Sequence, residues 1–420
     1  MSTWVTSTLG KECSIAIGGT PARKRLDFWD INKQTENHWV AIADLKGRFI
    51  RLTAEMLSDE GVRNSSAKLV KRGTVLLSFK LTVGRAAIAD IDLYTNEAIA
   101  ALRSETLDEL FLYYGVQSWN LLADLDQAIK GATLNKEKLK RIPITFPKCR
   151  EIQVVIARVL DKVDQVIEKT EALLAKQQGI KRGLMHDLLT RGLDAQGCLR
   201  DPSTHRFKYT DIGYVPFDWD VVPLETLVPP SSPICYGIVQ VGPYTFGGVP
   251  TIAIRDLNDI RVQNLHHTDP EREKQFSRSR CEAGDLLISI KATIGRIGLA
   301  PDGFNGNISR DLARVRLLPS ECPSFFKYQL QSAAGQSRLE SITVGTTRKE
   351  LSIIPLRSLL LVRPKPDEQQ MISVKVQRLE ADLAELDRSI DKLLLLKAGL
   401  MRDLIAGRVP VSSLLSNPNL

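Results

Sequence analysis

The sequence predicts an α+β fold in which two duplicated α/β domains are joined by two long antiparallel coiled-coil helices, a pseudo-two-fold dumb-bell. Three observations predict this fold. One uninterrupted helical pattern occupies residues 149–192, a second copy of it lies near the end of the chain, and the same succession of strand and loop motifs precedes each copy. Two long helices with one register in one chain are most simply each other's partners.

The first long helix is predicted by residues that recur at alternating steps of four and three, the heptad spacing of a coiled-coil seam. Its seam positions are Ile156, Leu160, Val163, Ile167, Thr170, Leu174, Gln177, Lys181, Leu184 and Leu188. A shift of 216 residues (399 − 183) gives the second seam: Ile372, Val376, Leu379, Leu383, Leu386, Ile390, Leu393, Lys397, Leu400 and Leu404. Both helices end in Gly-Leu-Met-x-Asp-Leu, so the whole helix is repeated.

The first globular unit is predicted to mix strands with helices. Short apolar runs at 39–42, 74–79 and 86–91, each bounded by glycine or charge, predict strands. Residues 107–119 and 121–129 predict helices. The unit is expected to end at Ile142-Pro143-Ile144 and Pro147, because these prolines terminate the preceding element before the long helix begins.

The second unit repeats the plan of the first at a nearly constant offset. Trp219 with Leu224 matches Trp4 with Leu9 at 215 residues (219 − 4). The strand-and-loop stretches 72–85 and 283–296 match at 211 residues (283 − 72). Most side chains between these anchors differ, so specificity is expected where the halves diverge.

The expected order of parts is a domain at 1–150, a helix at 151–195, a domain at 196–365, a helix at 366–410 and a tail at 411–420. A helix of about 40 residues spans roughly 60 Å, so the first helix carries the chain to the second domain. The second helix is expected to return antiparallel and to bury the repeated seam. Asp367, with Gln370 three residues later, is expected to cap it.

The first long helix carries a second apolar row, which makes its apolar stripe wider than a two-stranded pair needs. The row is Ile152, Val155, Val159, Val166, Leu173 and Ile180. Two interpretations remain open: the row packs on its own globular unit, or it is a docking face for another subunit.

Composition predicts a soluble globular protein without a membrane-spanning segment. The 420 residues are 43% hydrophobic and 25% charged, which is typical of globular domains, and no run of about 18 apolar residues exists. Residues 1–19 show no secretion-signal pattern. The six cysteines form no C-x-x-C pair, which disfavours a zinc site and a disulfide framework. We therefore expect a cytoplasmic protein with no metal and no cofactor.

Catalytic signatures are mostly missing from the sequence. It has no G-x-x-x-x-G-K-[ST], G-x-G-x-x-G, G-x-S-x-G or H-E-x-x-H. The Asn/Asp-Pro-Pro-aromatic tetrapeptide of amino-group DNA methyltransferases is missing too, because Pro229-Pro230 precedes Ser231. His266-His267 lies in a charged region, where solvated side chains are expected rather than a metal site. These absences favour a chain that is not an enzyme.

Two repeated loops are the best candidates for contact with DNA, which the net charge of +8 admits. Each follows a strand ending in serine and combines Lys, Thr, Gly and Arg within six residues. Lysine, arginine and threonine bind phosphates, and arginine also reads guanine in the major groove. The alternative is a hairpin turn with solvated charges. The predicted contact residues are Lys80, Thr82 and Arg85 in the first loop and Lys291, Thr293 and Arg296 in the second.

Two further clusters mix basic residues with aromatics and are weaker candidates for DNA contact. The first is Arg23, Lys24 and Arg25 near Trp29, and the second includes Arg278 and Arg280 near Phe276. Solvated surface charge is the alternative for each cluster.

The ordered set of motifs resembles the specificity (S) subunits of type I restriction-modification systems over nearly the whole chain. The resemblance rests on Gly18-Gly19-Thr20-Pro21, on the stretches 76–85 and 284–296, on 212–219, and on the two helices with their shared ending. No single motif is decisive, but the ordered set with its duplication is specific.

The resemblance implies that the globular units are target recognition domains, each reading half of a bipartite, asymmetric site on double-stranded DNA. It implies that the paired helices set the distance between half-sites and hold methyltransferase (M) subunits, two of them, with restriction (R) subunits completing the complex. Adenine methylation and cleavage then belong to those partners. In one departure the second unit lacks Gly-Gly-Thr-Pro and has Tyr236-Gly237-Ile238-Val239-Gln240 in that region, so its recognition loop should differ.

Two other functions remain open on the sequence. One is a DNA-binding regulator or structural protein that works without enzyme partners. The other is an enzyme whose catalytic site follows no recognised motif.

Overall fold

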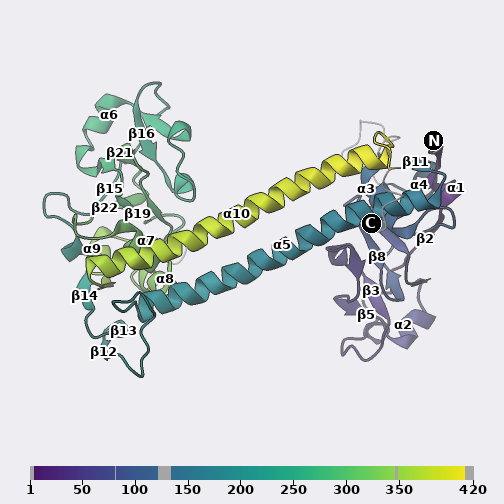
Figure 1. The fold of residues 1–420 in the computed structure, drawn as a ribbon, viewed down its shortest axis with the longest axis horizontal. Coiled ribbons are helices and arrows are strands. Elements are labelled where there is room, and N and C mark those ends of the chain that lie inside the picture. Colours follow the sequence, from purple (N-terminus) through teal and green to yellow (C-terminus); the bar gives the residue numbers. More distant parts are fainter. Residues whose placement is uncertain (1–3, 81, 122–133, 346–348, 412–420) are drawn as a thin grey trace. The chain divides into compact units, whose positions relative to one another are not determined.

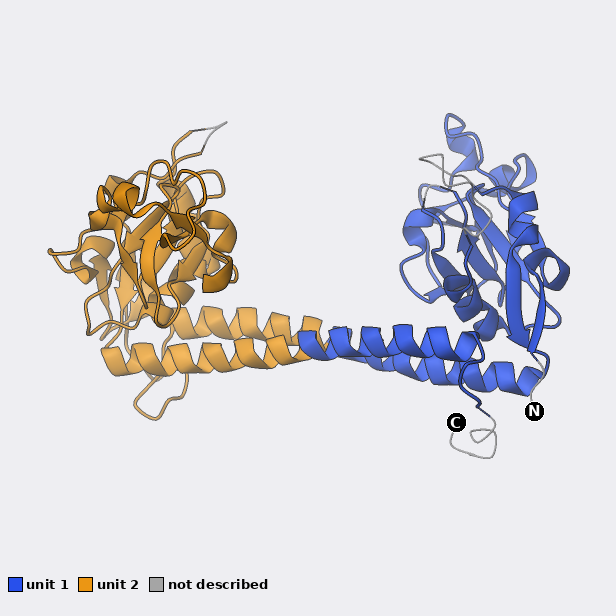
Figure 2. Ribbon diagram, turned by 90° about the horizontal axis from the view of Figure 1, so that it is seen from above, with its two compact units in different colours: residues 1–172, 387–420 blue, residues 173–386 orange. Residues whose placement is uncertain are grey.

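The computed structural model of the chain describes residues 4–80, 82–121, 134–345 and 349–411 (Figure 1). The helix expected at 121–129 lies outside the described residues except for Leu121. The chain divides into two compact units, unit 1 with residues 1–172 and 387–420 and unit 2 with residues 173–386 (Figure 2). The long helices α5 (Arg150–Thr190) and α10 (Pro366–Ile405) therefore each contribute to both units.

The described part of unit 1 contains three sheets. The first sheet pairs β1 (Trp4–Thr8) with β11 (Pro143–Pro147). The second has the strand order β2 (Ser14–Ile17), β10 (Ile99–Arg103), β7 (Val75–Ser78), β8 (Ala86–Ala89), β4 (Phe49–Ile50). The third has the strand order β5 (Glu55–Met56), β3 (His38–Val40), β9 (Leu93–Thr95), β6 (Leu69–Val70). Its shorter helices are α1 (Leu9–Glu12), α2 (Asp59–Arg63), α3 (Glu109–Ser118) and α4 (Lys136–Arg141), with the 3-10 turns η1 (Leu26–Phe28) and η2 (Ile42–Asp44).

Unit 2, where the structure describes it, repeats these sheets in the same order, except that its second sheet has four strands and no counterpart of β4, and it adds a hairpin. The hairpin pairs β12 (Phe207–Thr210) with β13 (Gly213–Pro216), and the first repeated sheet pairs β14 (Asp220–Pro223) with β23 (Leu360–Arg363). The second repeated sheet has the strand order β15 (Cys235–Tyr236), β22 (Leu312–Val315), β19 (Leu286–Ser289), β20 (Ile297–Leu299). The third has the strand order β17 (His266–Thr268), β16 (Val249–Ile252), β21 (Asn305–Ile308), β18 (Cys281–Glu282). Its shorter helices are α6 (Pro270–Lys274), α7 (Pro323–Gln331), α8 (Ala333–Ser341) and α9 (Ile353–Arg357), with the 3-10 turns η3 (Leu224–Leu227), η4 (Ile254–Asp256), η5 (Val262–Asn264) and η6 (Ser277–Ser279).

The predicted fold class is confirmed: two repeated domains of mixed helix and sheet are accompanied by two long helices. The strands expected in the first domain appear as β3, β7 and β8, each slightly shorter than predicted, and the helix expected at 107–119 appears as α3. The cap expected at Asp367 is wrong, because α10 already begins at Pro366. Proline suits the first helical position because its missing N–H would have no partner there.

The predicted seam residues face inward on both helices. In unit 1, Ile156 and Leu160 near the start of α5 lie in one core with Leu404 near the end of α10. In unit 2, Leu188 near the end of α5 lies in one core with Ile372 and Val376 near the start of α10. Since the start of each helix packs with the end of the other, the helices run antiparallel within each unit. The remaining seam residues are buried or half-buried: Val163, Ile167, Thr170, Leu174, Gln177, Lys181, Leu184, Leu379, Leu383, Leu386, Ile390, Leu393, Lys397 and Leu400.

In unit 1 a buried carboxylate joins the globular body to both long helices. The hydroxyl of Tyr114, in α3, donates to Asp164 of α5 at 2.8 Å. Lys397 of α10 pairs with the same carboxylate at 2.7 Å. Asp164 is only 7% exposed, so a tyrosine and a lysine together replace its contacts with water.

Unit 2 contains the same three-way contact. Tyr328, in α7, donates to Glu380 of α10 at 2.8 Å, and Lys181 of α5 pairs with Glu380 at 2.7 Å. The offsets from the unit 1 residues are 214 (328 − 114), 216 (380 − 164) and 216 (397 − 181). The lysines that interrupt the apolar seam therefore have a partner in each unit.

These contacts shift the pKa of the groups involved. Burial would raise the pKa of Glu380, but hydrogen bonds from Lys181 and Tyr328 hold it below the ordinary value of glutamate. Burial, and then the neighbouring carboxylate, raises the pKa of both tyrosines, Tyr114 and Tyr328. At neutral pH both tyrosines are therefore neutral phenols and Glu380 is a carboxylate.

A second repeated device is a fully buried glutamine in the first turns of each long helix. The Gln153 amide donates to the Pro147 carbonyl at 2.9 Å, and its oxygen accepts from the backbone N–H of Asp108 at 2.8 Å. Gln369 makes the same two kinds of contact, with the Pro364 carbonyl at 2.9 Å and the Cys322 N–H at 2.8 Å. The sequence prediction missed this pair, although the offset of 216 (369 − 153) would have found it.

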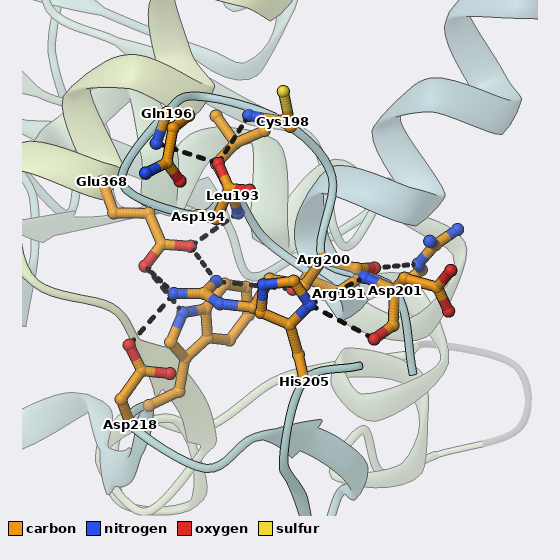
Figure 3. A network of polar contacts seen from close by, with 11 residues as sticks. Arg191, Leu193, Asp194, Gln196, Cys198, Arg200, Asp201, His205, Asp218 and Glu368 are labelled. Carbon is orange, nitrogen blue, oxygen red and sulfur yellow. Dashed lines mark hydrogen bonds and ion pairs between the residues drawn. The ribbon is translucent and has the colours of Figure 1, made fainter. Parts of the chain in front are cut away.

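The start of α10 is further anchored by a buried ion cluster in unit 2 (Figure 3). Glu368 accepts from Arg200 at 3.0 Å, from the indole of Trp219 at 3.0 Å and from the Leu193 N–H at 2.8 Å. Arg200 also pairs with Asp218 at 3.0 Å. The cluster ties the segment that follows α5 to the first turn of α10, whose dipole favours a carboxylate there.

The repeated tryptophans each cover the glycine that follows a long helix. Gly192 after α5 and Gly407 after α10 have φ of +66° and +67°. A Cβ on either would lie 2.4 Å from the indole of Trp219 or Trp4, respectively. Both the backbone angle and the close approach therefore require glycine.

The second apolar row of α5 divides into two parts. Ile152, Val155 and Val159 pack in the core of unit 1, whereas Val166, Leu173 and Ile180 are 43 to 47% exposed. Packing on the globular unit therefore accounts for the first half of the row only. No helix in the described part of the chain is long and apolar enough to cross a membrane.

Replacing Lys397 with methionine should destabilise unit 1, because Asp164 would stay buried without its cation. We expect the free energy of unfolding, measured by urea denaturation, to fall by about 1–3 kcal/mol. Lys392→Met on the exposed face of α10 is the matched control and should change little. Equal effects of the two substitutions would show that the buried pair contributes nothing.

Candidate nucleic-acid interface

The described residues of the two repeated loops make the same backbone contacts, organised by a buried serine. In unit 1 the Ser78 hydroxyl donates to the Thr82 carbonyl and accepts from the Arg85 N–H at 3.0 Å. In unit 2 the Ser289 hydroxyl donates to the Thr293 carbonyl at 2.5 Å and accepts from the Arg296 N–H at 2.8 Å.

Turn geometry therefore explains why serine and glycine recur in these loops. Gly84 and Gly295, with φ of +96° and +83°, each donate a backbone N–H to the carbonyl of the serine. Glycine adopts such angles readily, whereas other residues do so at a cost.

The loop arginines project from this rigid turn. Arg85 and Arg296 are exposed, and neither makes an ion pair with any residue the structure describes. Thr82 and Thr293 are exposed beside them. An exposed guanidinium held on a short hydrogen-bonded turn can bind a phosphate or a base edge with little loss of conformational entropy.

The loop lysines differ between the units. Lys291 pairs with Glu350 at 2.9 Å, whereas the ammonium of Lys80 lies 5.5 Å from the ring centre of Phe79. The loop in unit 2 therefore presents less uncompensated positive charge than the loop in unit 1.

In the Arg23-Lys24-Arg25 cluster, two of the three cations are already paired. Arg23 forms a two-pronged ion pair with Glu55 and stacks 4.0 Å from the ring centre of Trp29. Arg25 pairs with Asp27 at 2.6 Å. Lys24 is exposed, and no ion pair of it occurs among the described residues.

The cluster in unit 2 is arranged in a similar way. Arg280 binds Glu273 through two hydrogen bonds of 2.9 Å. That contact lowers the pKa of Glu273, which also accepts from Asn307. Arg278 is exposed and lies beyond these contacts. Arg280 is therefore a structural cation, and Arg278 is the one free to bind a ligand.

Each unit also exposes apolar side chains at the end of its second-sheet edge strand or after it: in unit 1 this stretch follows Gly18-Gly19-Thr20-Pro21, and in unit 2 it begins at Tyr236. In unit 2 these are Tyr236, Tyr244 and Phe246, which are 54, 58 and 94% exposed. In unit 1, Leu26 and Ile31 are 68 and 71% exposed. The sequence prediction noted that the segment differs between the units and named Tyr236 within it, but it did not name the other four side chains; aromatics flanked by glycine were the available signal.

The His266-His267 pair packs on this loop. The His267 ring stacks on Tyr244 with 5.4 Å between ring centres, and His266 meets the same ring edge-on at 6.0 Å. Across the residues that the structure describes, no three His, Cys, Asp or Glu side chains gather as metal ligands do.

The chain is similar to specificity subunits of type I restriction-modification systems. Residues 1–177 match the family described as "Type I restriction modification DNA specificity domain". The type I restriction enzyme EcoBI specificity subunit of Escherichia coli is 26% identical over 65% of this chain and 59% of its own length. The MjaVIII specificity subunit of Methanocaldococcus jannaschii is 22% identical over 88% of both chains. The chain thus spans about three-fifths of the first of these relatives and most of the second.

Solved structures share the fold over nearly the whole chain. The type I restriction-modification system S subunit from M. genitalium is 14% identical, with a TM-score of 0.56 over 96% of both chains. A chain from a structure on complex assembly and conformational transition of the type I R-M system is 17% identical, with a TM-score of 0.60 over 96% of this chain and 97% of its own.

Proposed function

Since this chain belongs to the specificity subunits of type I restriction-modification systems, we propose that it selects the DNA site for such a system. It reads double-stranded DNA and has no catalytic role of its own. Adenine methylation and cleavage are carried out by methyltransferase and restriction subunits that it directs.

The repetition of one frame with two different surfaces is the observation that supports a bipartite, asymmetric site. The serine turns and the strand orders repeat, whereas the exposed side chains around them differ. A homodimer reads a palindrome because its halves are identical. A fused pair of diverged halves reads two unlike half-sites, and the long helices set the spacing between them.

Arg85 and Arg296 are the residues that best fit DNA contact within this proposal. They occupy equivalent positions and are free of ion pairs within the described chain. Arg278 and Lys24 extend the cationic surface of their own units, whereas Arg23, Arg25 and Arg280 chiefly hold loops in place through Glu55, Asp27 and Glu273.

A methyltransferase subunit docks on the exposed half of the second apolar row. Val166, Leu173 and Ile180 are spaced seven residues apart, so they share one face of α5. The equivalent positions of α10 are Asp382, Ser389 and Leu396 (166 + 216 = 382). The row is therefore not repeated, and a second methyltransferase subunit needs a different surface.

Alanine at Arg85 and Arg296 should weaken binding to DNA and reduce its salt dependence. If each arginine neutralises one phosphate, removing both should lower the slope of log affinity against log salt by about 1.8. Fluorescence anisotropy with a duplex at several salt concentrations measures this slope. Arg402→Ala is the matched control, because Arg402 is paired with Asp403 at 3.0 Å. An unchanged slope in the double variant would show that neither arginine contacts a phosphate, and the loops would then be turns with solvated charges.

Aspartate at Val166 and Ile180 should prevent association with the methyltransferase subunit while leaving the fold intact, because both side chains are nearly half exposed. Size-exclusion chromatography of the mixed subunits should show separate peaks in place of one complex. Lys169→Asp, on an exposed position of the same helix, controls for added negative charge. Co-elution of the double variant would reject the docking face.

A further inference from the structure

A cavity of about 290 Å³ lies within unit 2. Its apolar wall consists of Met185 and Leu189 from the end of α5, with Ile212 from the turn of the β12–β13 hairpin and Val215 from β13. The start of α8 and the side chains of Gln329 and Arg338 provide its polar wall. None of these residues belongs to the loops proposed to contact DNA.

In unit 1 the equivalent place is filled by an indole. Trp119 corresponds to Ala333 at the offset of 214 (333 − 119) that also relates Tyr114 to Tyr328. A Cβ on Gly115 would lie 2.5 Å from the Trp119 ring, so the ring lies directly on that glycine. Unit 2 has Gln329 (329 − 115 = 214) and a small Ala333 instead, so the ring and its platform are both missing there.

The strand contact made by the indole is taken over by the glutamine. Trp119 donates its indole N–H to the Thr145 carbonyl of β11 at 3.3 Å. Gln329 donates its amide to the Val362 carbonyl of β23 at 3.2 Å. These carbonyls are equivalent, because Thr145 pairs with Thr6 and Val362 pairs with Val221, 215 residues later.

The polar wall presents groups that lack partners among the residues that the structure describes. Gln329 is 2% exposed, and its side-chain oxygen accepts no hydrogen bond. The Nε of Arg338 is buried and unpaired, and burial without a carboxylate lowers the pKa of this arginine. Ser332, Ala333 and Ala334 also line the cavity, so the N-terminus of α8, with its positive dipole end, borders it; the Ser332 hydroxyl caps this end by accepting from the Gly335 N–H at 3.1 Å.

We propose that this cavity binds a small aromatic carboxylate. Its ring lies against Met185 and Ile212, in the place that Trp119 fills in unit 1. Its carboxylate binds Arg338 and the first turn of α8, and a ring N–H donates to the free oxygen of Gln329. The site is a ligand site separate from the recognition of DNA.

Three related probes test the proposal on the intact chain by isothermal titration calorimetry: indole-3-acetate, indole and tryptamine. We expect indole-3-acetate to bind at least tenfold more tightly than indole, because a charge-assisted hydrogen bond contributes roughly 1.5–3 kcal/mol. Tryptamine, which carries a cation in place of the carboxylate, should bind more weakly than indole. Binding of none of the three at millimolar concentration, or equal binding of all three, would overturn the proposal.

Two variants locate the site. Ala333→Trp should abolish binding of indole-3-acetate, because its indole would occupy space that the small alanine leaves open. Arg338→Met should weaken indole-3-acetate about tenfold and leave indole unchanged, which a merely unfolded variant would not do. Arg206→Met, at an arginine outside the cavity that stacks on Phe217, is the control and should bind as the original chain does. Unchanged binding by Ala333→Trp, or equal weakening of indole and indole-3-acetate by Arg338→Met, would place binding elsewhere and contradict the proposal.

Discussion

The contact on which each unit depends is the carboxylate held between a tyrosine of the globular body and a lysine of the other long helix. Lys181 and Lys397 occupy positions where a coiled-coil seam would be apolar, and Asp164 and Glu380 lie beside that seam, so their desolvation is offset by the lysine and the tyrosine that bind each carboxylate. A lysine reaches that carboxylate in one register and one direction only. A polar group at a seam position is known to specify register at some cost in stability. The triads therefore fix how the helices pair and where each body attaches to them.

A fixed frame allows the surfaces to diverge. The buried glutamines, the serine turns and the tryptophan-covered glycines recur because each satisfies a backbone requirement that changes in exposed residues leave untouched. Around them, Lys80 and Lys291 differ in pairing, and the exposed aromatics of unit 2 have only aliphatic counterparts in unit 1. The two halves also differ in their interior, because Trp119 fills in unit 1 the place that is an open cavity in unit 2.

The helices and the duplication were predictable because both are local patterns: a heptad spacing and a constant offset can be read along the chain. Long-range pairing was not. No local sequence pattern predicts that Arg23 pairs with Glu55 or that Tyr114 binds Asp164, because these contacts depend on how segments far apart in the sequence pack together. The apolar row illustrates the limit: its residues stay on one face of α5 from Ile152 to Ile180, and the extent of the globular body decides that Val159 is packed and Val166 exposed.

The most direct test of the central claim, that two diverged halves on one frame read two unlike half-sites, is to map modified adenines. DNA would be sequenced from cells that carry this chain with its methyltransferase subunit and from cells that carry the methyltransferase alone. We expect modified adenines in a motif found only in cells that carry the chain, with two different half-sites separated by a spacer of fixed length. A palindromic or single contiguous motif, or no new motif although the two proteins associate, would contradict it.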